Sequence, residues 1–168
     1  YLYSSKLLRQ LVLCKVLRPE YCLDFSSLEE MMYEGGILQS LRHPNVVEGH
    51  GGALEKRPKI VMQYLQEQNP ATTFFGGNYH AFGLWYFISV AKQVVEAPTY
   101  FHAHGYLHPD VKPSNVMFHS SHVTLFDFSV AEEYSPDNPI KDNTGTVEYM
   151  AAGRGHQGVA QAVCHKDR

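Results

Sequence analysis

The sequence contains little cysteine, with only three residues in 168: Cys14, Cys22 and Cys164. They form no CxxC pair and no spacing typical of a metal site. A sparse and odd cysteine count argues against a disulfide-stapled secreted scaffold and favours a reducing compartment. We therefore expect a cytoplasmic protein.

Long hydrophobic runs are also lacking. The longest run, residues 84–91, holds eight residues and includes Ser89, whereas a membrane-spanning helix needs about 20 apolar residues. The first residues show no signal-peptide pattern. We therefore expect no membrane association.

Basic charge is not in excess, because 14 Lys and Arg stand against 17 Asp and Glu, for a net charge of −3. A nucleic-acid-binding domain normally carries a basic stripe, so we expect no nucleic-acid partner. Apolar residues, by contrast, are abundant: 44% of the chain is hydrophobic and 12% is aromatic. This composition supports a hydrophobic core in a chain of single-domain size.

Hydrophobic periodicity predicts secondary structure along most of the chain. In the N-terminal half it predicts one strand or a strand pair over 7–17, a helix over 26–41 capped by Ser26 or Ser27, and short strands at 46–47 and 59–62. In the C-terminal half it predicts a polar linker over 66–80, a helix over 82–104 that contains Pro98, extended segments at 106–107, 115–118 and 122–126, and a loop over 132–144.

The motif with the most chemical content is HPDVKPSN at residues 108–115, which resembles the catalytic loop H-R-D-L-x-x-x-N of eukaryotic protein kinases. Asp127-Phe128-Ser129 resembles the metal-binding D-F-G of that family, and GTVEYMA at 145–151 resembles the end of a Ser/Thr kinase activation segment. Further resemblances lie upstream in the family's order: VLCK at 12–15 to V-A-I-K, HPNVV at 43–47 to the entry of a strand, and IVMQYL at 60–65 to the hinge.

The resemblance implies a two-lobed α+β protein-kinase-like fold and ATP-dependent phosphorylation of protein serine or threonine hydroxyls, with ATP and Mg²⁺ as cofactors. Phosphoryl transfer depends mainly on positioning and charge neutralisation. By resemblance, Asp110 accepts or orients the proton of the substrate hydroxyl, and Lys112 lies beside the transferred phosphate. Asn115 and Asp127 supply oxygen ligands to Mg²⁺, which prefers them. Thr146 is the residue that bonds Asp110 and Lys112.

The nucleotide side of the site follows from the same resemblance. Lys15 would hold the α and β phosphates and pair with Glu34. On residues alone, Lys15 could instead be a strand lysine that extends to solvent, and Glu34 a carboxylate on a helix surface. The resemblance makes Met62 the gatekeeper, Gln63, Tyr64 and Leu65 the hinge that presents backbone groups to adenine, and Met117 the apolar floor beneath it.

Histidine is common, with ten residues, but we expect no metal site among them. His108 is expected to be a packed structural residue rather than a base.

The sequence departs from the family pattern at several positions. No G-x-G-x-x-G precedes Lys15, Leu13 stands in place of a small alanine, and Pro109 replaces the arginine before the catalytic aspartate. Ser129 replaces the glycine of D-F-G, which restricts a hinge-like backbone position. Gly49 occupies a position that is normally apolar.

These observations divide the chain into residues 1–65, a partial N-lobe with the hinge, residues 66–151, a partial C-lobe with the catalytic loop and activation segment, and residues 152–168, a divergent tail. The fold is expected to be truncated, without the Gly-rich loop and most of the helical C-lobe. An alternative function is a pseudokinase or interaction fragment with little or no catalysis, acting on a protein partner. A third possibility is a fragment that holds no unique fold.

Overall fold

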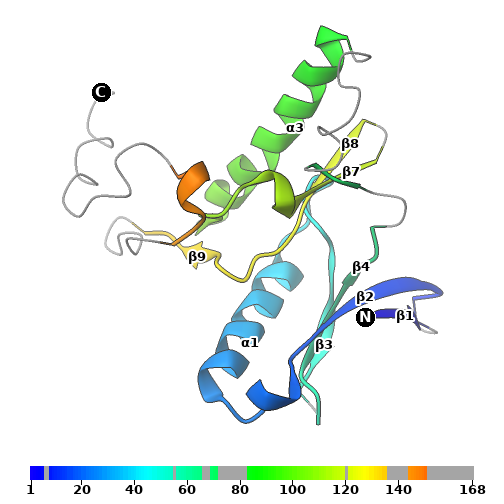
Figure 1. The fold of residues 1–168 in the computed structure, drawn as a ribbon, viewed down its shortest axis with the longest axis vertical. Helices are drawn as coiled ribbons and strands as arrows, with labels where there is room; N and C mark the ends of the chain where they lie inside the picture. The colour runs from blue at the N-terminus through cyan, green and yellow to red at the C-terminus, as the bar shows by residue number, and fades with distance from the viewer. Residues whose placement is uncertain are drawn as a thin grey trace.

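The structure is a computed structural model of the 168-residue chain, and it describes residues 1–5, 8–54, 56–65, 69–71, 83–119, 121–135 and 144–150. A sheet and helix α1 form one part of the molecule, and helix α3 with two short sheets forms the other (Figure 1). This α+β arrangement is the fold class that the sequence predicted.

A four-stranded antiparallel sheet forms the first part, in the order β1-β2-β4-β3. The predicted strand within 7–17 is present as β2, and the one predicted at 59–62 is present as β4. Alternation along β2 buries Val12 and Cys14 and turns Leu13 and Lys15 to the opposite face. The strands are β1 (Leu2–Ser5), β2 (Gln10–Val16), β3 (Gly49–Ala53) and β4 (Lys59–Gln63).

The strand predicted at 46–47 is wrong. Val46 makes only an isolated bridge to Leu125, and the backbone N–H of Val47 donates to the Leu125 carbonyl at 2.9 Å. Both valines are buried, so their hydrophobicity reflects the core rather than a strand of the main sheet. The strand instead covers the glycine-rich residues Gly49–Ala53.

Close packing against helix α1 explains why this strand is rich in glycine. A Cβ atom added to Gly49 would lie 2.7 Å from the carbonyl carbon and oxygen of Leu38 on α1. No real side chain tolerates such a distance from backbone atoms, so only glycine lets strand and helix approach this closely. Local strand propensity, which disfavours glycine, is overridden by this contact.

Helix α1 (Phe25–Ser40) covers one face of the sheet (Figure 1). The predicted helix over 26–41 is confirmed, but its predicted caps are wrong. Asp24 is the N-cap, and its carboxylate accepts the backbone N–H of Ser27 at 3.0 Å and the hydroxyls of Ser26 and Ser27. A carboxylate satisfies the orphan N–H groups of the first turn and suits the helix dipole.

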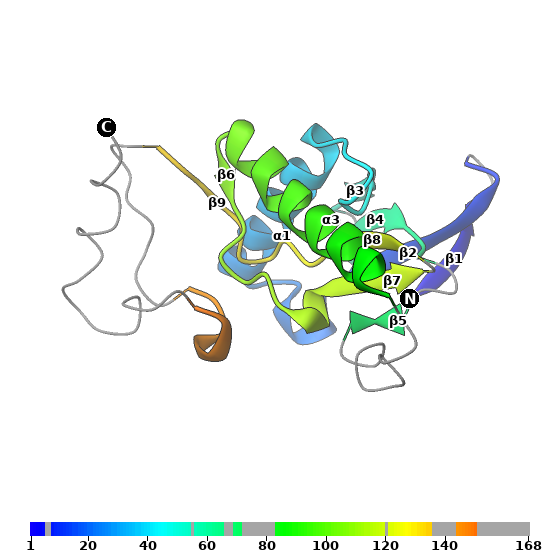
Figure 2. The same cartoon turned by 90° about the horizontal axis from the view of Figure 1, so that it is seen from above.

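Helix α3 (Leu84–Ala103) is the long helix predicted over 82–104, and Pro98 lies inside it. It packs against β8 and β6 (Figure 2). The extended segments predicted at 106–107, 115–118 and 122–126 correspond to strands within one residue at either end. The short strands are β5 (Asn69–Pro70), β6 (Tyr106–Leu107), β7 (Val116–His119), β8 (His122–Leu125) and β9 (Glu132–Glu133). β5 falls in the segment predicted as a linker over 66–80, and β9 falls in the segment predicted as a loop over 132–144, so both predictions are wrong at these short strands. Most of both segments lies outside the described residues.

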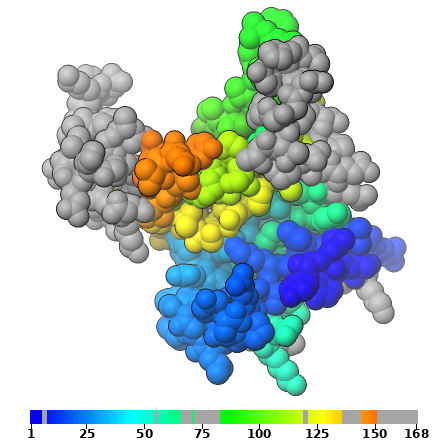
Figure 3. Space-filling view, viewed as in Figure 1, coloured from blue at the N-terminus to red at the C-terminus, as the bar shows by residue number. Residues whose placement is uncertain are grey.

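The segment after β8 lies between the two parts of the molecule. In the space-filling view it forms the yellow band between the blue and cyan sheet with α1 and the green α3 region (Figure 3). A single core runs through both parts and includes Leu38 from α1, Phe101 from α3 and Phe128 from the connecting segment. The hydroxyl of Tyr33 on α1 accepts the backbone N–H of Glu133 in β9 at 2.9 Å, which adds a polar contact between the parts. Among the described helices, none has the length and apolar character needed to cross a bilayer.

Candidate active site

A cleft of about 310 Å³ opens between the sheet and the segment after β8. Four of the residues predicted from the sequence line it together: Lys15, Glu34, Met62 and Asp127. Leu13, which stands where the family has alanine, lines it as well. The remaining lining residues are Tyr1, Cys14, Leu38 and Phe126, none of which was predicted to be part of the site.

The Lys15 ammonium pairs with the Glu34 carboxylate, with Nζ 2.9 Å from Oε1 and 2.8 Å from Oε2. The Glu34 side chain is only 4% exposed, which excludes a solvated carboxylate on the helix surface. Burial acts to lower the pKa of Lys15, but Glu34 and Asp127 outweigh it and hold that pKa above the ordinary value for lysine. Lys15 therefore stays charged at neutral pH.

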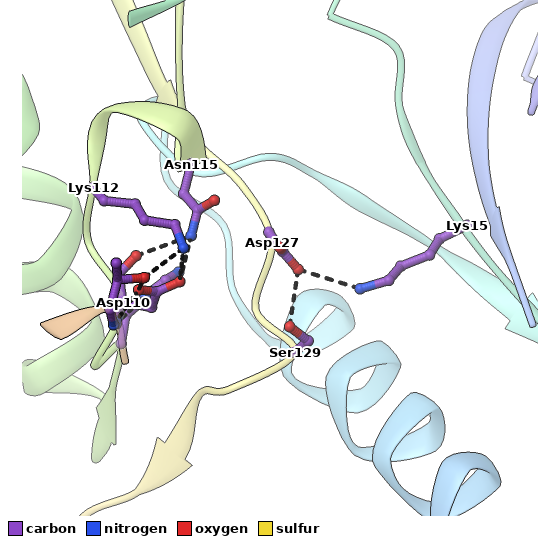
Figure 4. A network of polar contacts seen from close by, with 8 residues as sticks. Lys15, Asp110, Lys112, Asn115, Asp127 and Ser129 are labelled. Atoms are coloured by element: carbon purple, nitrogen blue, oxygen red, sulfur yellow. Dashed lines mark hydrogen bonds and ion pairs between the residues drawn. The ribbon is translucent and has the colours of Figure 1, made fainter. Parts of the chain in front are cut away.

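Asp127 lies on the opposite wall of the cleft, with its Oδ1 atom 3.3 Å from the Lys15 ammonium (Figure 4). Its backbone has a positive φ of 64°, a conformation that non-glycine residues seldom adopt and that often marks a functional position. Burial opposes ionisation of this carboxylate, but Lys15 and the Ser129 hydroxyl outweigh it and lower the pKa of Asp127. Asp127 is thus an anion at neutral pH.

Asp110 is the centre of a second polar group, on the loop between β6 and β7 (Figure 4). Its Oδ2 atom is 2.7 Å from the Lys112 ammonium. Its Oδ1 atom accepts the backbone N–H of Thr146 at 2.9 Å and the Thr146 hydroxyl at 2.6 Å. Lys112 also donates to the Thr146 hydroxyl oxygen at 2.6 Å, and the Asn115 amide donates to Asp110 Oδ2 at 3.1 Å. Burial opposes ionisation of Asp110, but the contacts with Lys112 and Thr146 outweigh it and lower the pKa of Asp110.

A glycine allows Thr146 to reach this group. Gly145 has a φ of +113°, and a Cβ atom there would lie 2.5 Å from the Pro109 carbonyl oxygen. Both the backbone conformation and the close approach therefore require glycine. Gly145 thus brings the 144–150 segment against the 108–115 loop, so that Thr146 meets Asp110 across 36 positions of sequence.

Asn115 and Asp127 carry the oxygen atoms suited to a cation. The Asn115 amide nitrogen donates to the backbone carbonyl and the Oδ2 atom of Asp110. The Asn115 amide oxygen remains as an acceptor and points toward the side on which Asp127 lies (Figure 4). The Asp127 side chain is 41% exposed to the cleft. No group of three or more His, Cys, Asp or Glu suited to a metal occurs in the described part of the chain. One carboxylate and one amide oxygen fit Mg²⁺, which takes few protein ligands and completes its shell with water and phosphate.

Of the residues predicted on the adenine side, Met62 lines the cleft and Met117 does not. Met62 is buried in the cleft and pairs in register with Leu13. The Gln63 backbone N–H already donates to the Glu48 carbonyl at 2.8 Å, and Leu65 packs against the core. Tyr64 is half-buried beside them. Met117 lies on β7 opposite Thr124 and is not among the described residues that line the cleft.

His108 packs among aromatic rings, as expected for a structural histidine. Its ring meets Phe128 edge-on at a centroid distance of 5.0 Å, and Phe128 stacks on Phe101 at 4.7 Å. Burial lowers the pKa of His108, and the nearby backbone carbonyls, Asp110 and Asp127 offset this only in part. The imidazole is therefore neutral in the folded protein at neutral pH.

Stability is accordingly expected to fall as the pH drops below the ordinary histidine value of 6.5, because the unfolded chain then binds a proton that folded His108 resists. One such group contributes at most about 1.4 kcal/mol of unfolding free energy per pH unit. Denaturant unfolding between about pH 7.5 and pH 5.5 measures the slope. Burial raises the pKa of Glu34, which contributes a slope of the opposite sign in every variant, so the difference between variants isolates His108. His108→Phe should flatten the slope. Equal slopes in wild type and His108→Phe would contradict the assignment.

Comparisons with known proteins agree with this geometry. A family model described as the protein kinase domain matches residues 2–157. The chain is 29% identical to serine/threonine-protein kinase AtPK1/AtPK6 of Arabidopsis thaliana, over 95% of this chain and 35% of that protein. It is 30% identical to AtPK2/AtPK19 of the same plant, over 87% of this chain and 32% of that protein. Myosin light chain kinase 3 of Rattus norvegicus is 28% identical, over 73% of this chain and 16% of that protein. The chain thus spans about a third or less of the length of these relatives.

Proposed function

Since the chain belongs to the protein kinase family, we propose that it transfers the γ-phosphoryl group of ATP to a serine or threonine hydroxyl of a protein substrate. The observation that carries this proposal is the presence of two separate groups of interacting polar side chains. Lys15, Glu34 and Asp127 form one group, and Asp110, Lys112 and Thr146 form the other. The first provides a cation and a carboxylate for phosphate and metal, and the second provides an oriented carboxylate for a hydroxyl.

In this proposal Asp110 accepts a hydrogen bond from the attacking hydroxyl and orients it, because Thr146 and Lys112 fix both carboxylate oxygens. Lys112 provides positive charge beside the transferred phosphoryl group. Lys15, held by Glu34, binds the α and β phosphates. Asn115 and Asp127 would hold Mg²⁺, which supplies charge neutralisation on the phosphates when bound.

The remaining assignments follow from the same proposal. In it, residues 1–65 are the partial N-lobe and hinge, residues 66–151 the partial C-lobe with the catalytic loop and activation segment, and residues 152–168 a divergent tail. Met62 and the hinge residues Gln63, Tyr64 and Leu65 contact the adenine side, with Met117 as an apolar residue below it. We also propose a cytoplasmic location, which the free thiols of Cys14 and Cys22 support.

Nucleotide affinity is expected to be weak because Leu13 projects into the cleft. Leu13 is 37% exposed and lines the cleft in register with Met62, where extra bulk crowds an aromatic base. Leu13→Ala should therefore tighten ATP binding. The change is measured as a greater thermal stabilisation at fixed ATP and Mg²⁺, since ligand at 100 times its Kd adds about 2.7 kcal/mol.

Leu11→Ala is the matched control. Leu11 lies on the same face of β2, is similarly exposed at 42%, and is not among the residues that line the cleft. It should leave the ATP-induced shift unchanged. A Mg²⁺-dependent shift in wild type at micromolar ATP would contradict weak binding, and equal shifts for Leu13→Ala and Leu11→Ala would contradict the role of Leu13. Absence of any shift in all variants would contradict the proposed nucleotide site.

A further inference from the structure

Ser129 makes a contact that the glycine of the family pattern cannot make. Its hydroxyl donates to Oδ1 of Asp127 at 3.0 Å (Figure 4). The Lys15 ammonium lies 3.3 Å from the same oxygen. Two side-chain donors therefore converge on one oxygen of this carboxylate, and among the described residues no side chain donates to Oδ2.

We propose that Ser129 is a positioning residue that withholds Oδ1 of Asp127 from a divalent cation, so that the carboxylate presents Oδ2 alone. The inference rests on the proposed function, in which Asp127 is a metal ligand. It assigns the serine a role in setting metal affinity.

Competition for lone pairs is the physical basis of this inference. A carboxylate can bind a cation through one or both oxygens, and each hydrogen-bond donor occupies acceptor capacity that the cation would use. The Ser129 hydroxyl is tethered two residues from Asp127, so it returns to Oδ1 more readily than a free water molecule does. Removing the Ser129 hydroxyl leaves Lys15 and water at Oδ1, and a cation displaces the water more easily than a tethered hydroxyl.

Ser129 is exposed, which makes the inference testable without disturbing the core. Ser129→Ala removes the hydroxyl and keeps the Cβ atom, so backbone freedom hardly changes. Ser129→Gly removes both and restores the family residue. Ser129→Thr keeps the donor. Ser40→Ala is the matched control, because Ser40 is another exposed serine whose hydroxyl bonds a protein oxygen, the Ile37 carbonyl, outside the cleft.

The experiment measures Mn²⁺ affinity by the loss of the free Mn²⁺ signal in electron paramagnetic resonance, with no nucleotide present. Ser129→Ala and Ser129→Gly should bind Mn²⁺ about three- to ten-fold more tightly than wild type, the factor expected for one net hydrogen bond. Ser129→Thr and Ser40→Ala should bind as wild type does, and Asp127→Asn should lose the site.

Equal or weaker Mn²⁺ binding by Ser129→Ala, while Asp127→Asn loses the site, overturns the role of Ser129 and leaves the proposed function standing. Mn²⁺ binding that Asp127→Asn does not weaken overturns both this inference and the metal-binding role of Asp127 in the proposed function. No binding by any variant overturns this inference alone, because in the proposed function the cation also takes phosphate ligands.

Discussion

Replacing Asp110 with asparagine is expected to lower phosphate transfer from ATP to a protein by about 10²- to 10⁴-fold, the range that a positioned acid–base group contributes. Asparagine has nearly the same shape but lacks the negative charge. The pairing with Lys112 at 2.7 Å then weakens, and one of the two oxygens that accept from Thr146 and Asn115 is replaced by an NH₂ group. A substrate hydroxyl loses both its acceptor and its orientation.

Asp127→Asn should likewise remove Mg²⁺-dependent transfer, because the neutral amide binds a divalent cation poorly. Asp24→Asn is the matched control for both changes. It converts another aspartate to asparagine, at an exposed helix cap where asparagine serves as well. Labelled phosphate incorporation measures all four proteins. Near-normal transfer by Asp110→Asn, or an equal loss in Asp24→Asn, would contradict the assignment.

Gly49→Ala is expected to destabilise the fold by about 1–3 kcal/mol, the usual effect of forcing extra atoms into a packed interior. The added Cβ atom would lie 2.7 Å from the Leu38 carbonyl, and backbone atoms of a helix cannot move aside as a flexible side chain does. To relieve this contact, α1 must move away from β3, and α1 carries Glu34. The measurement is the free energy of unfolding from denaturant titration.

Gly36→Ala provides the control because Gly36 lies within α1 and a Cβ atom there meets nothing within 4 Å. Alanine at this helix position should stabilise the protein by about 0.5–1 kcal/mol. The two substitutions are chemically identical, so their opposite signs isolate the contact with Leu38. If Gly49→Ala were as stable as wild type, the close approach of β3 and α1 would be wrong.

Hydrophobic periodicity predicted the helices and strands whose apolar residues repeat within the element itself. The helices Phe25–Ser40 and Leu84–Ala103 and the strand Lys59–Gln63 follow from repeating apolar positions that each element buries along its own length. The glycine-rich strand Gly49–Ala53 could not be predicted in this way. Its residues disfavour strands, and the reason for them is a contact with a helix that precedes it in the chain.

The site could be predicted only through the family resemblance. The Lys15 ammonium meets Asp127 across 112 positions of sequence, and Thr146 meets Asp110 across 36, so no local spacing relates them. The N-cap was missed for a different reason: Asp24, Ser26 and Ser27 are all good capping residues, and only the backbone geometry decides which one begins the helix. The contribution of Tyr1 to the cleft was missed because it depends on the pairing of β1 with β2.

Phosphate transfer by the wild-type chain tests the central claim most directly. The chain is incubated with γ-labelled ATP, Mg²⁺ and casein, and the label is mapped to residue type after hydrolysis. The proposed function predicts label on serine or threonine that disappears when EDTA removes the metal and falls to background with Asp110→Asn. Incorporation by wild type no greater than by Asp110→Asn, or incorporation that persists in EDTA, would contradict it.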